Sequence, residues 1–253
     1  MLSRASADSE QLRSRVGRHR NWYHRIELGQ GVVTPGTHDS QTALQVLDGL
    51  GLPVVCAGLR VLDIGCRDGF FAFELERRGA RVVGLDYADP TVTGFAIAAE
   101  ALESRVEYRV ENVYELDPRR HGLFEIVLFL GVLYHVRNPM LALDRVRGVT
   151  RPGGLVFVET QISSNGTGSS AEPPLWRYFP RDSLRGDETN KWAPNLPGLT
   201  GMLEDCQLLV EEVAATEDRA TVRARSFANR RLEYYRKLDA GTRIWGQGGR
   251  PAD

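Results

Sequence analysis

Short apolar segments alternate with amphipathic segments through most of the chain. Runs rich in Val, Leu, Ile and Phe predict buried strands at residues 60–65, 81–86, 105–113, 124–131 and 155–160. Apolar residues at helical spacing predict helices at residues 70–79, 89–102 and 138–149. The last two helices begin with a capping residue before a proline, Asp89 before Pro90 and Asn138 before Pro139. This order predicts right-handed crossovers and a doubly wound, mainly parallel α/β sheet.

Before the first strand, Asp39 and Ser40 are candidate caps for a helix at residues 39–50. The sequence RPGG at 151–154 predicts a turn before the fifth strand. The regular pattern stops at about residues 161–197, a segment too long to be an ordinary connection. Its aromatic residues, Trp176, Tyr178, Phe179 and Trp192, predict that it is ordered.

The C-terminal part predicts a short helix and a final strand pair. The helix lies around 198–206, and the strands at 207–216 and 219–227 are joined by a tight turn. We therefore divide the chain into an N-terminal arm or lid (1–54), a main domain (55–229) with the insertion, and a C-terminal tail (230–253).

Composition and charge restrict the class of protein. An apolar content of 42% and a net charge of −1 indicate a globular protein and argue against nucleic-acid binding, which usually needs a positive excess. No apolar run approaches the roughly 20 residues that span a bilayer, and no apolar stretch follows Arg4, so we expect a cytoplasmic protein without a secretion signal. Three cysteines without paired spacing predict neither disulfides nor a zinc site.

The sequence VLDIGCRDGFF contains the main chemical signal. A strand runs into Asp63, the chain turns through Gly65 and Gly69, and a helix follows. Glycines allow a tight turn and close approach of a ligand to the backbone. A carboxylate at the strand end repels the pyrophosphate of a dinucleotide but attracts an ammonium group. The pattern therefore favours S-adenosylmethionine, which carries a cationic amine and a cationic sulfur.

Further cofactor contacts are expected at the ends of the next strands. Asp86 closes the second strand and is placed to accept hydrogen bonds from both ribose hydroxyls. Asn112 and Val113, at the end of the third strand, fall where an adenine would lie, with the Asn112 amide able to bond the base edge. Tyr87 and Leu130, next to strand ends, complete the expected cofactor set.

This ordered set resembles the class I S-adenosylmethionine-dependent methyltransferases over roughly residues 55–160. The resemblance implies a seven-stranded Rossmann-like sheet whose last strands form an antiparallel pair. One position departs from the family pattern. Arg67 stands where glycine is common, so its side chain must point away from the cofactor or the loop must shift.

A narrower resemblance covers both flanks. The motifs WYHRIELGQGVVTPG (22–36), GVLYHVRNP (131–139) and DETNKWAPNLPGL (187–199) are similar to methyltransferases related to the tRNA wobble-uridine carboxymethyltransferases, a group that also contains small-molecule tailoring enzymes. The resemblance implies that the arm folds over the cofactor and that the insertion lines the substrate pocket.

Two histidines are candidate catalysts. His135 and its neighbour Tyr134 lie past the fourth strand, where open α/β sheets bind ligands, and a histidine can deprotonate an alcohol or phenol. The alternative is that His135 bonds to nearby backbone and fixes the loop. His24 is the second candidate and Tyr23 is expected to cover the cofactor, with lid packing as the alternative for both. The other three histidines, His19, His38 and His121, are expected to be exposed.

The expected substrate contacts come mainly from the insertion. Trp176 and Trp192 offer aromatic faces, and Asn190 and Asn195 offer amides suited to a flat polar molecule, unless the asparagines cap backbone groups. Glu159 ends the fifth strand and is either a ligand for a substrate hydroxyl or amine, or a neutral rim residue.

Three functions follow from these patterns. The leading prediction is metal-free methyl transfer to an oxygen or nitrogen of a small molecule, plausible for secondary metabolism, because neither an N/D-P-P-Y motif nor a magnesium-type carboxylate cluster is present. The second is modification of a tRNA wobble base, through terminal arginines at 13, 15, 18, 20, 230, 231 and 236. The third is a non-catalytic cofactor-binding subunit. The pattern does not predict an oligomeric state.

Overall fold

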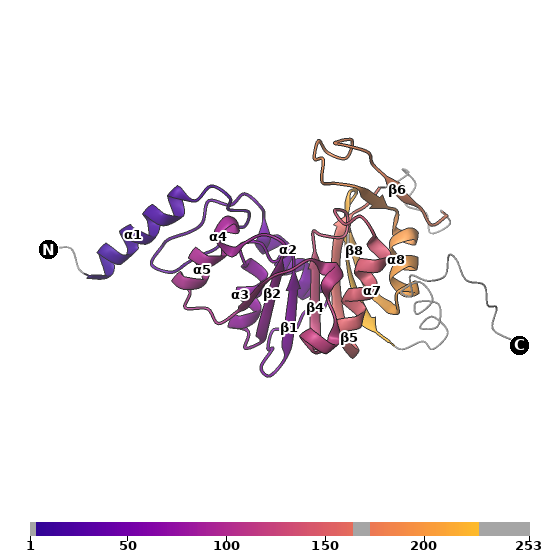
Figure 1. Cartoon of the computed structure of the whole chain (residues 1–253), viewed down its shortest axis with the longest axis horizontal. Coiled ribbons are helices and arrows are strands. Elements are labelled where there is room, and N and C mark those ends of the chain that lie inside the picture. The colour runs from indigo at the N-terminus through magenta and orange to yellow at the C-terminus, as the bar shows by residue number, and fades with distance from the viewer. Residues whose placement is uncertain (1–3, 164–172, 228–253) are drawn as a thin grey trace, which may run out of the picture.

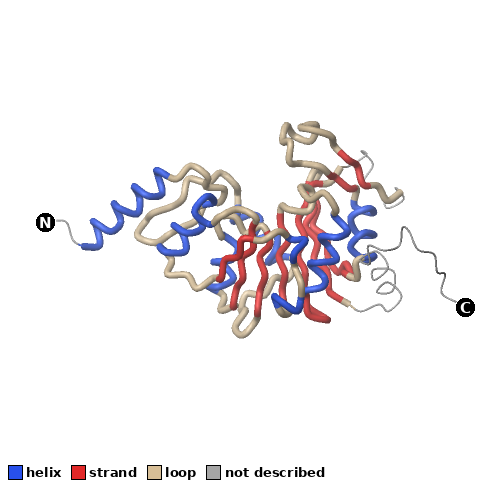
Figure 2. The backbone as a smooth tube through the Cα atoms, in the orientation of Figure 1, coloured by secondary structure: helices blue, strands red, loops and turns tan. Residues whose placement is uncertain are grey.

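The computed structural model describes residues 4–163 and 173–227, and its centre is one seven-stranded sheet. Figures 1 and 2 show the strands side by side, in the order β3-β2-β1-β4-β5-β9-β8. The strands are β1 (Arg60–Ile64), β2 (Arg81–Asp86), β3 (Glu107–Val110), β4 (Phe124–Leu130), β5 (Thr150–Gln161), β8 (Leu208–Ala215) and β9 (Arg219–Ser226). The first five are parallel, and β9 is antiparallel to both of its neighbours. The predicted Rossmann-like sheet with its final antiparallel pair is confirmed.

Helices connect these strands and begin mostly at the predicted caps. They are α1 (Arg4–Arg18), α2 (Ser40–Gly49), α3 (Phe70–Arg77), α4 (Pro90–Thr93), α5 (Phe95–Ala101), η1 (Val113–Glu115), α6 (Pro118–His121), α7 (Pro139–Val149) and α8 (Leu196–Asp205). The side chains of Asp39, Asp89 and Asn138 each accept a hydrogen bond from a backbone amide in the first turn of α2, α4 and α7. Each cap satisfies a donor that the helix itself leaves without a partner.

Two local predictions are wrong. The helix predicted at 89–102 is interrupted by Gly94, which has a φ of +88°. A Cβ there would lie 2.8 Å from the ring of Trp22, so the break accommodates the arm. The residues 151–154, predicted as a turn, belong to β5, because Thr150 already pairs with Phe124 before a shift in register.

Apolar side chains fill both faces of the sheet. On one face, Leu62 and Ile64 of β1 belong to a buried cluster with residues of α7 and α8. On the other face, Val61 belongs to a cluster with residues of α2 and α3. Burial of these two layers is the main force that stabilises the domain, and it fixes the carboxyl ends of the parallel strands along one edge.

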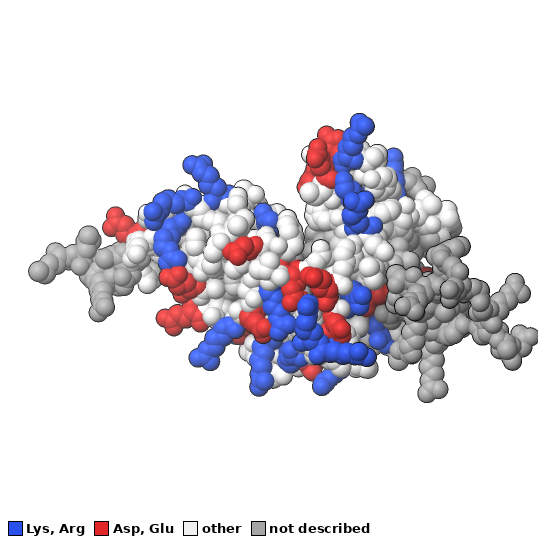
Figure 3. Space-filling view, in the orientation of Figure 1, with Lys and Arg blue, Asp and Glu red and all other residues white. Residues whose placement is uncertain are grey.

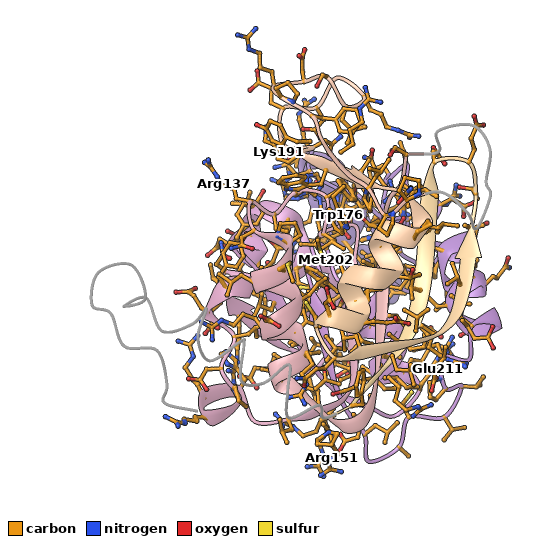
Figure 4. All side chains as sticks on the ribbon, turned by 90° about the vertical axis from the view of Figure 1, so that its right-hand side faces the viewer. Arg137, Arg151, Trp176, Lys191, Met202 and Glu211 are labelled. Carbon is orange, nitrogen blue, oxygen red and sulfur yellow. The ribbon has the colours of Figure 1, made fainter. Side chains whose placement is uncertain are left out.

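Two segments stand on either side of that edge. The arm lies at one end of the molecule, where Arg15 of α1 forms a bidentate ion pair with Glu100 of α5 at 2.6 and 2.7 Å. At the other end rises a hairpin of β6 (Trp176–Tyr178) and β7 (Trp192–Pro194). Figure 3 shows the surface hollowed between them. Residues 179–191, between β6 and β7, form the hairpin connection. Figure 4 shows its Lys191 at one end of the molecule and Arg151, at the start of β5, at the opposite end.

Candidate active site

The carboxylate of Asp63 is the most unusual group at the carboxyl edge of the sheet. Its side chain is buried at 2% exposure, and the Oδ2 atom has no hydrogen-bond partner among the described residues. Burial, with a contribution from the charge of Asp86, raises the pKa of Asp63 to about 7. A buried carboxylate without a counter-charge is costly. The site therefore fits a ligand that brings a cation to Asp63, as an amino-acid ammonium group does.

The two predicted glycines leave bare backbone beside this carboxylate. Gly65 has a φ of +75°, and a Cβ there would lie 2.4 Å from Cγ2 of Val132. Gly69 has a φ of +95° and is the N-cap of α3. Only glycine adopts this conformation without strain, so both positions keep the turn open for close approach of a ligand.

Arg67 stands where the methyltransferases that the sequence resembles often have glycine. It adopts the left-handed conformation with a φ of +51°. Its backbone N–H donates to Oδ2 of Asp86 at 3.0 Å, and its guanidinium carbon lies 5.5 Å from the ring centre of Tyr23. The side chain is thus directed to the arm. Asp86 also accepts from the amide of Ala88 at 3.0 Å, and its carboxylate oxygens have further lone pairs for ribose hydroxyls.

The remaining expected cofactor residues differ in exposure. Asn112 is exposed, and its side-chain oxygen accepts from the amide of Tyr114 at 3.1 Å as the N-cap of η1. Its amide nitrogen can donate to the edge of a base, and its oxygen keeps a second lone pair. Val113 is buried in the core, Leu130 is half-buried, and Tyr87 is 79% exposed beside Asp86.

The arm is attached directly to the glycine loop. The ring Nδ1 of His24 is hydrogen-bonded to the buried carboxylate of Asp68, and His24 is only 5% exposed. This environment supports the packing interpretation of His24. Tyr23, beside it, stacks on His38 with ring centres 4.7 Å apart. Burial and the neighbouring His24 lower the pKa of His38.

The prediction that His19, His38 and His121 are exposed is wrong. His38 is half-buried under Tyr23, and His19 is half-buried with its ring edge against Trp22. His121 is 3% exposed, and its Nε2 lies 2.8 Å from Oε2 of Glu111. Aromatic partners cover His19 and His38, and a carboxylate binds the buried ring of His121. The polar residues next to each histidine in the sequence did not indicate these contacts, so the prediction from local polarity was misleading.

The structure brings Tyr134 and His135 together just past the carboxyl end of β4. Tyr134 is buried, His135 is half-buried, and their ring centres lie 4.1 Å apart. Nδ1 of His135 is 3.0 Å from Oγ1 of Thr189 in the hairpin connection. Burial lowers the pKa of His135 and the charge of Arg219 adds to this, whereas a hydrogen bond with the backbone of Thr189 and the charge of Asp187 oppose it. His135 is therefore neutral near pH 7, the form that accepts a proton.

Sequence reasoning missed the partner of Glu159. Arg219, at the start of β9, forms a bidentate ion pair with this carboxylate, with Nη2 2.7 Å from Oε2. The guanidinium also lies over the ring of Tyr134 at 5.2 Å. The antiparallel pairing of β9 with β5 creates the contact, and no local pattern indicates it.

Most polar groups of the predicted substrate residues already form hydrogen bonds with other residues of the protein. Asn195 caps α8 by accepting from the amide of Gly198 at 2.9 Å, which supports the capping alternative. The Trp176 indole N–H donates to the Gly198 carbonyl, and Figure 4 shows this residue above Met202 of α8. The Trp192 indole N–H donates to the carbonyl of Val136.

Asn190 differs from Asn195 because one of its polar atoms is unmatched. Its amide nitrogen donates to the carbonyl of Leu184 at 3.0 Å. Its Oδ1 is buried without a hydrogen-bond partner among the residues described. This oxygen remains a candidate substrate contact.

Other features of the described segments concern metals, membranes and thiols. Within residues 4–163 and 173–227, no group of three His, Cys, Asp or Glu side chains is arranged to hold a metal ion. No helix in the same ranges is long and apolar enough to cross a membrane. Cys56, Cys66 and Cys206 are all buried thiols. The arginines 230, 231 and 236 and the tail 230–253 lie outside the described residues.

Comparison with known proteins gives a match in the same region. Residues 62–158 match the family described as a methyltransferase domain. A ubiquinone biosynthesis O-methyltransferase from Bradyrhizobium sp. (strain ORS 278) is 38% identical over 138 residues, which are 54% of this chain and 49% of the relative. The chain thus spans about half the length of the curated relatives that it matches.

Solved structures extend the likeness to most of the fold. The N-terminal domain of EvdMO1, in the presence of SAH and D-fucose, matches with a TM-score of 0.64 at 19% identity. The match covers 90% of this chain and 100% of that domain. The Burkholderia thailandensis 1,6-didemethyltoxoflavin-N1-methyltransferase, with bound 1,6-didemethyltoxoflavin and S-adenosylhomocysteine, matches with a TM-score of 0.54 at 19% identity. This match covers 90% of this chain and 92% of the methyltransferase chain. Residues 62–158 thus match a methyltransferase domain, and the sheet around them has the fold of these solved methyltransferase structures.

Proposed function

We propose that the chain transfers a methyl group from S-adenosylmethionine to an oxygen or nitrogen of a small molecule. The observation that carries this proposal is the buried carboxylate of Asp63, whose Oδ2 has no partner among the described residues. A carboxylate in that position attracts the ammonium group of a methionyl tail and repels a diphosphate. When bound, the cofactor supplies an electrophilic methyl group on a sulfonium.

Several residues of the chain are suited to hold the cofactor. Asp63 accepts hydrogen bonds from the ammonium group, and Asp86 accepts them from the ribose hydroxyls. Gly65 and Gly69 allow the backbone to approach the ligand. Tyr23 covers this part of the site from the arm. The exposed Tyr87 and Asn112 and the half-buried Leu130 surround the base, whereas the buried Val113 shapes the pocket from beneath.

His135 is the candidate general base. Methyl transfer by in-line displacement depends mainly on alignment, and a base is needed only when the nucleophile carries a proton with a high pKa. The neutral imidazole of His135 lies beside Tyr134 and close to the Glu159–Arg219 pair. Together with Trp192 and Asn190, these groups offer aromatic and polar contacts to a flat substrate that bears an ionisable hydroxyl or amine.

The relatives support a small-molecule substrate, because they are named for ubiquinone biosynthesis and toxoflavin methylation. The alternative, a tRNA wobble base, depends on arginines at both termini. Among the described ones, Arg15 is occupied by Glu100. Figure 3 also shows acidic side chains interspersed with the basic ones on the face in view. This pattern favours the small-molecule proposal.

The experiment has two parts. Calorimetric titration with S-adenosylhomocysteine tests the cofactor site, with Asp63→Ala as the control that should not bind. Tritiated methyl transfer is then measured with a metabolite extract of the host and, separately, with total RNA. We expect label in the metabolite fraction. Absence of binding would reject the cofactor, label in RNA alone would favour the tRNA alternative, and binding without any label would favour a non-catalytic subunit.

The role of His135 has its own test. We expect His135→Ala to reduce turnover by about 100- to 10,000-fold, the usual contribution of a general base. Affinity for S-adenosylhomocysteine should stay unchanged, because His135 is assigned to the substrate side. A fully active His135→Ala variant would leave this histidine with a packing role only.

A further inference from the structure

His135 is linked to the hairpin connection by a short chain of hydrogen bonds. Its Nδ1 lies 3.0 Å from Oγ1 of Thr189, although 54 residues separate the two. The same Oγ1 lies 2.7 Å from Oδ1 of Asp187, which also accepts from the backbone N–H of Thr189 at 2.8 Å. The carboxylate of Asp187 therefore holds the Thr189 hydroxyl in one orientation.

The direction of the protons in this chain follows from the groups present. The pKa of Asp187 is lowered, first by the hydrogen bond from the Thr189 hydroxyl and then by that from its amide. Asp187 is therefore ionised near neutral pH and can only accept. Thr189 has a single hydroxyl proton, which it donates to Asp187, so its oxygen can only accept from His135. Nδ1 of His135 must then carry the hydrogen, and Nε2 carries the lone pair.

The turn that carries Thr189 is itself fixed to the segment after β4. The backbone amides of Lys191 and Trp192 donate to the carbonyl of Tyr134 at 2.8 and 3.2 Å. Within the turn, the amide of Asn190 donates to the carbonyl of Asp187 at 3.1 Å. Thr189 is therefore anchored by the residue next to His135, and its backbone also forms a hydrogen bond with the imidazole.

We propose that Thr189 and Asp187 are positioning residues that hold His135 in its Nδ1–H tautomer, so that Nε2 is the atom that accepts the substrate proton. This inference rests on the proposed function, because it gives His135 the role of base. It also assigns a role to the hairpin connection, which orients the base as well as lining the pocket. Two charged groups act on the imidazole: Asp187 from the connection and Arg219 from β9.

The test measures the tautomer directly and needs no substrate. Long-range ¹H–¹⁵N correlation spectra of the ¹⁵N-labelled chain, at about pH 8, report which ring nitrogen of each neutral histidine carries the proton, because this pH is above the ordinary histidine pKa of about 6.5. His135→Gln assigns the signal. We expect the Nδ1–H form of His135 in the wild type. An Nε2–H form would overturn the proposal.

Variants of Thr189 and Asp187 test whether these hydrogen bonds, and not the rest of the environment of His135, set the tautomer. Thr189→Val keeps the shape but removes the hydroxyl, and Asp187→Ala frees that hydroxyl to donate to Nδ1. Each should shift the ratio of Nδ1–H to Nε2–H by about fivefold toward Nε2–H, the equivalent of one hydrogen bond of about 1 kcal/mol. Thr189→Ser should keep the wild-type ratio. An unchanged ratio in Thr189→Val would reject the role of the hydroxyl and leave the backbone of Thr189 as the partner of the imidazole.

Failure of this inference can be distinguished from failure of the proposed function. Loss of the tautomer preference in the variants, with no cofactor binding by the wild type, would support the hydrogen-bond chain and reject the enzyme. If a methyl acceptor is identified, Thr189→Val should lower kcat about fivefold with little change in KM, and Thr189→Ser should restore it. An unchanged kcat in Thr189→Val would reject the positioning role. Both residues are exposed, so we expect the variants to fold.

Discussion

Asp68 of the glycine loop and His24 of the N-terminal arm form a buried hydrogen-bonded pair. One oxygen of Asp68 is bound by Nδ1 of His24. The other accepts from the backbone amides of Tyr23 and His24, both at 2.8 Å. A single carboxylate with no exposed surface thus attaches the arm to the loop that holds Gly65 and Gly69. The attachment of the arm to the glycine loop depends on this pair.

Asp68→Ala is expected to release the arm. The change leaves the imidazole of His24 and two backbone amides without an acceptor, and each donor that stays unsatisfied costs about 1–3 kcal/mol of unfolding free energy. Hydrogen exchange over residues 22–38 should become faster, and affinity for S-adenosylhomocysteine should fall. Asp39→Ala is the matched control, because it removes an exposed helix cap in the same arm and should cost only about 1 kcal/mol. Slow exchange at 22–38 in Asp68→Ala would contradict this role.

Asp63→Asn is expected to raise the stability of the ligand-free protein and to weaken cofactor binding. The pKa of Asp63 is about 7 in the folded chain and 3.8 in the ordinary state, so its contribution to stability is complete below pH 3.8 and is lost as pH rises through about 7. The full loss is roughly 4 kcal/mol. At pH 8 the neutral amide avoids it, so thermal unfolding of Asp63→Asn should occur at a higher temperature.

Binding should show the opposite trend with pH. An ammonium group prefers the ionised form of Asp63, so the affinity for S-adenosylhomocysteine should rise as pH increases from 5 to 7, by at most about tenfold per pH unit. Calorimetry in buffers of different ionisation enthalpy should detect release of about one proton below pH 7. Asp63→Asn should show weak binding without this dependence. A wild-type affinity that is constant between pH 5 and 7 would exclude Asp63 as the ammonium ligand.

Local sequence patterns predicted the parts of the site that depend on one element. Asp63 and Asp86 were found because each ends an apolar strand, and parallel strands end at the same edge of the sheet. Asp39, Asp89 and Asn138 were found because capping acts within one helical turn. The pattern that predicts a strand therefore also predicts where its last side chain lies.

Contacts between elements could not be predicted in the same way. Gly94 lies inside the helix predicted at residues 89–102, but the helix breaks there, where Trp22 of the arm packs against the glycine. Arg219 meets Glu159 only because β9 pairs with β5. The segment that contains Thr189 gave no signal of its link to His135, because periodicity reports the face of a residue and not its partner.

Gly65→Ala tests whether the glycine loop needs open space or only an unusual backbone conformation. At Gly65 an added methyl group would lie 2.4 Å from Cγ2 of Val132 and would have to displace that side chain. Gly58 has a similar φ of +80°, but nothing lies within 4 Å of its Cβ position. Both alanine variants carry backbone strain of about 1 kcal/mol. Only Gly65→Ala should abolish binding of S-adenosylhomocysteine in calorimetry, and equal binding by both variants would contradict the close approach.

The pair of Glu159 and Arg219 should contribute as a coupled unit. Both side chains are partly buried, so removal of one partner leaves the other charge poorly solvated. We expect Glu159→Ala and Arg219→Ala each to lower the unfolding free energy by about 2 kcal/mol in urea titrations. The double variant Glu159→Ala with Arg219→Ala should lose clearly less than the sum, with a coupling energy of about 1 kcal/mol or more.

The same double-mutant cycle distinguishes a structural pair from a substrate ligand. If Glu159 mainly serves the ion pair, the neutral variant Glu159→Gln should lower the unfolding free energy, because Arg219 over the ring of Tyr134 loses its counter-charge. Strict additivity of the two alanine changes would mean that the charges do not stabilise each other in solution. The carboxylate of Glu159 would then be available to a substrate hydroxyl or amine, and Arg219 would need another anion to compensate its charge.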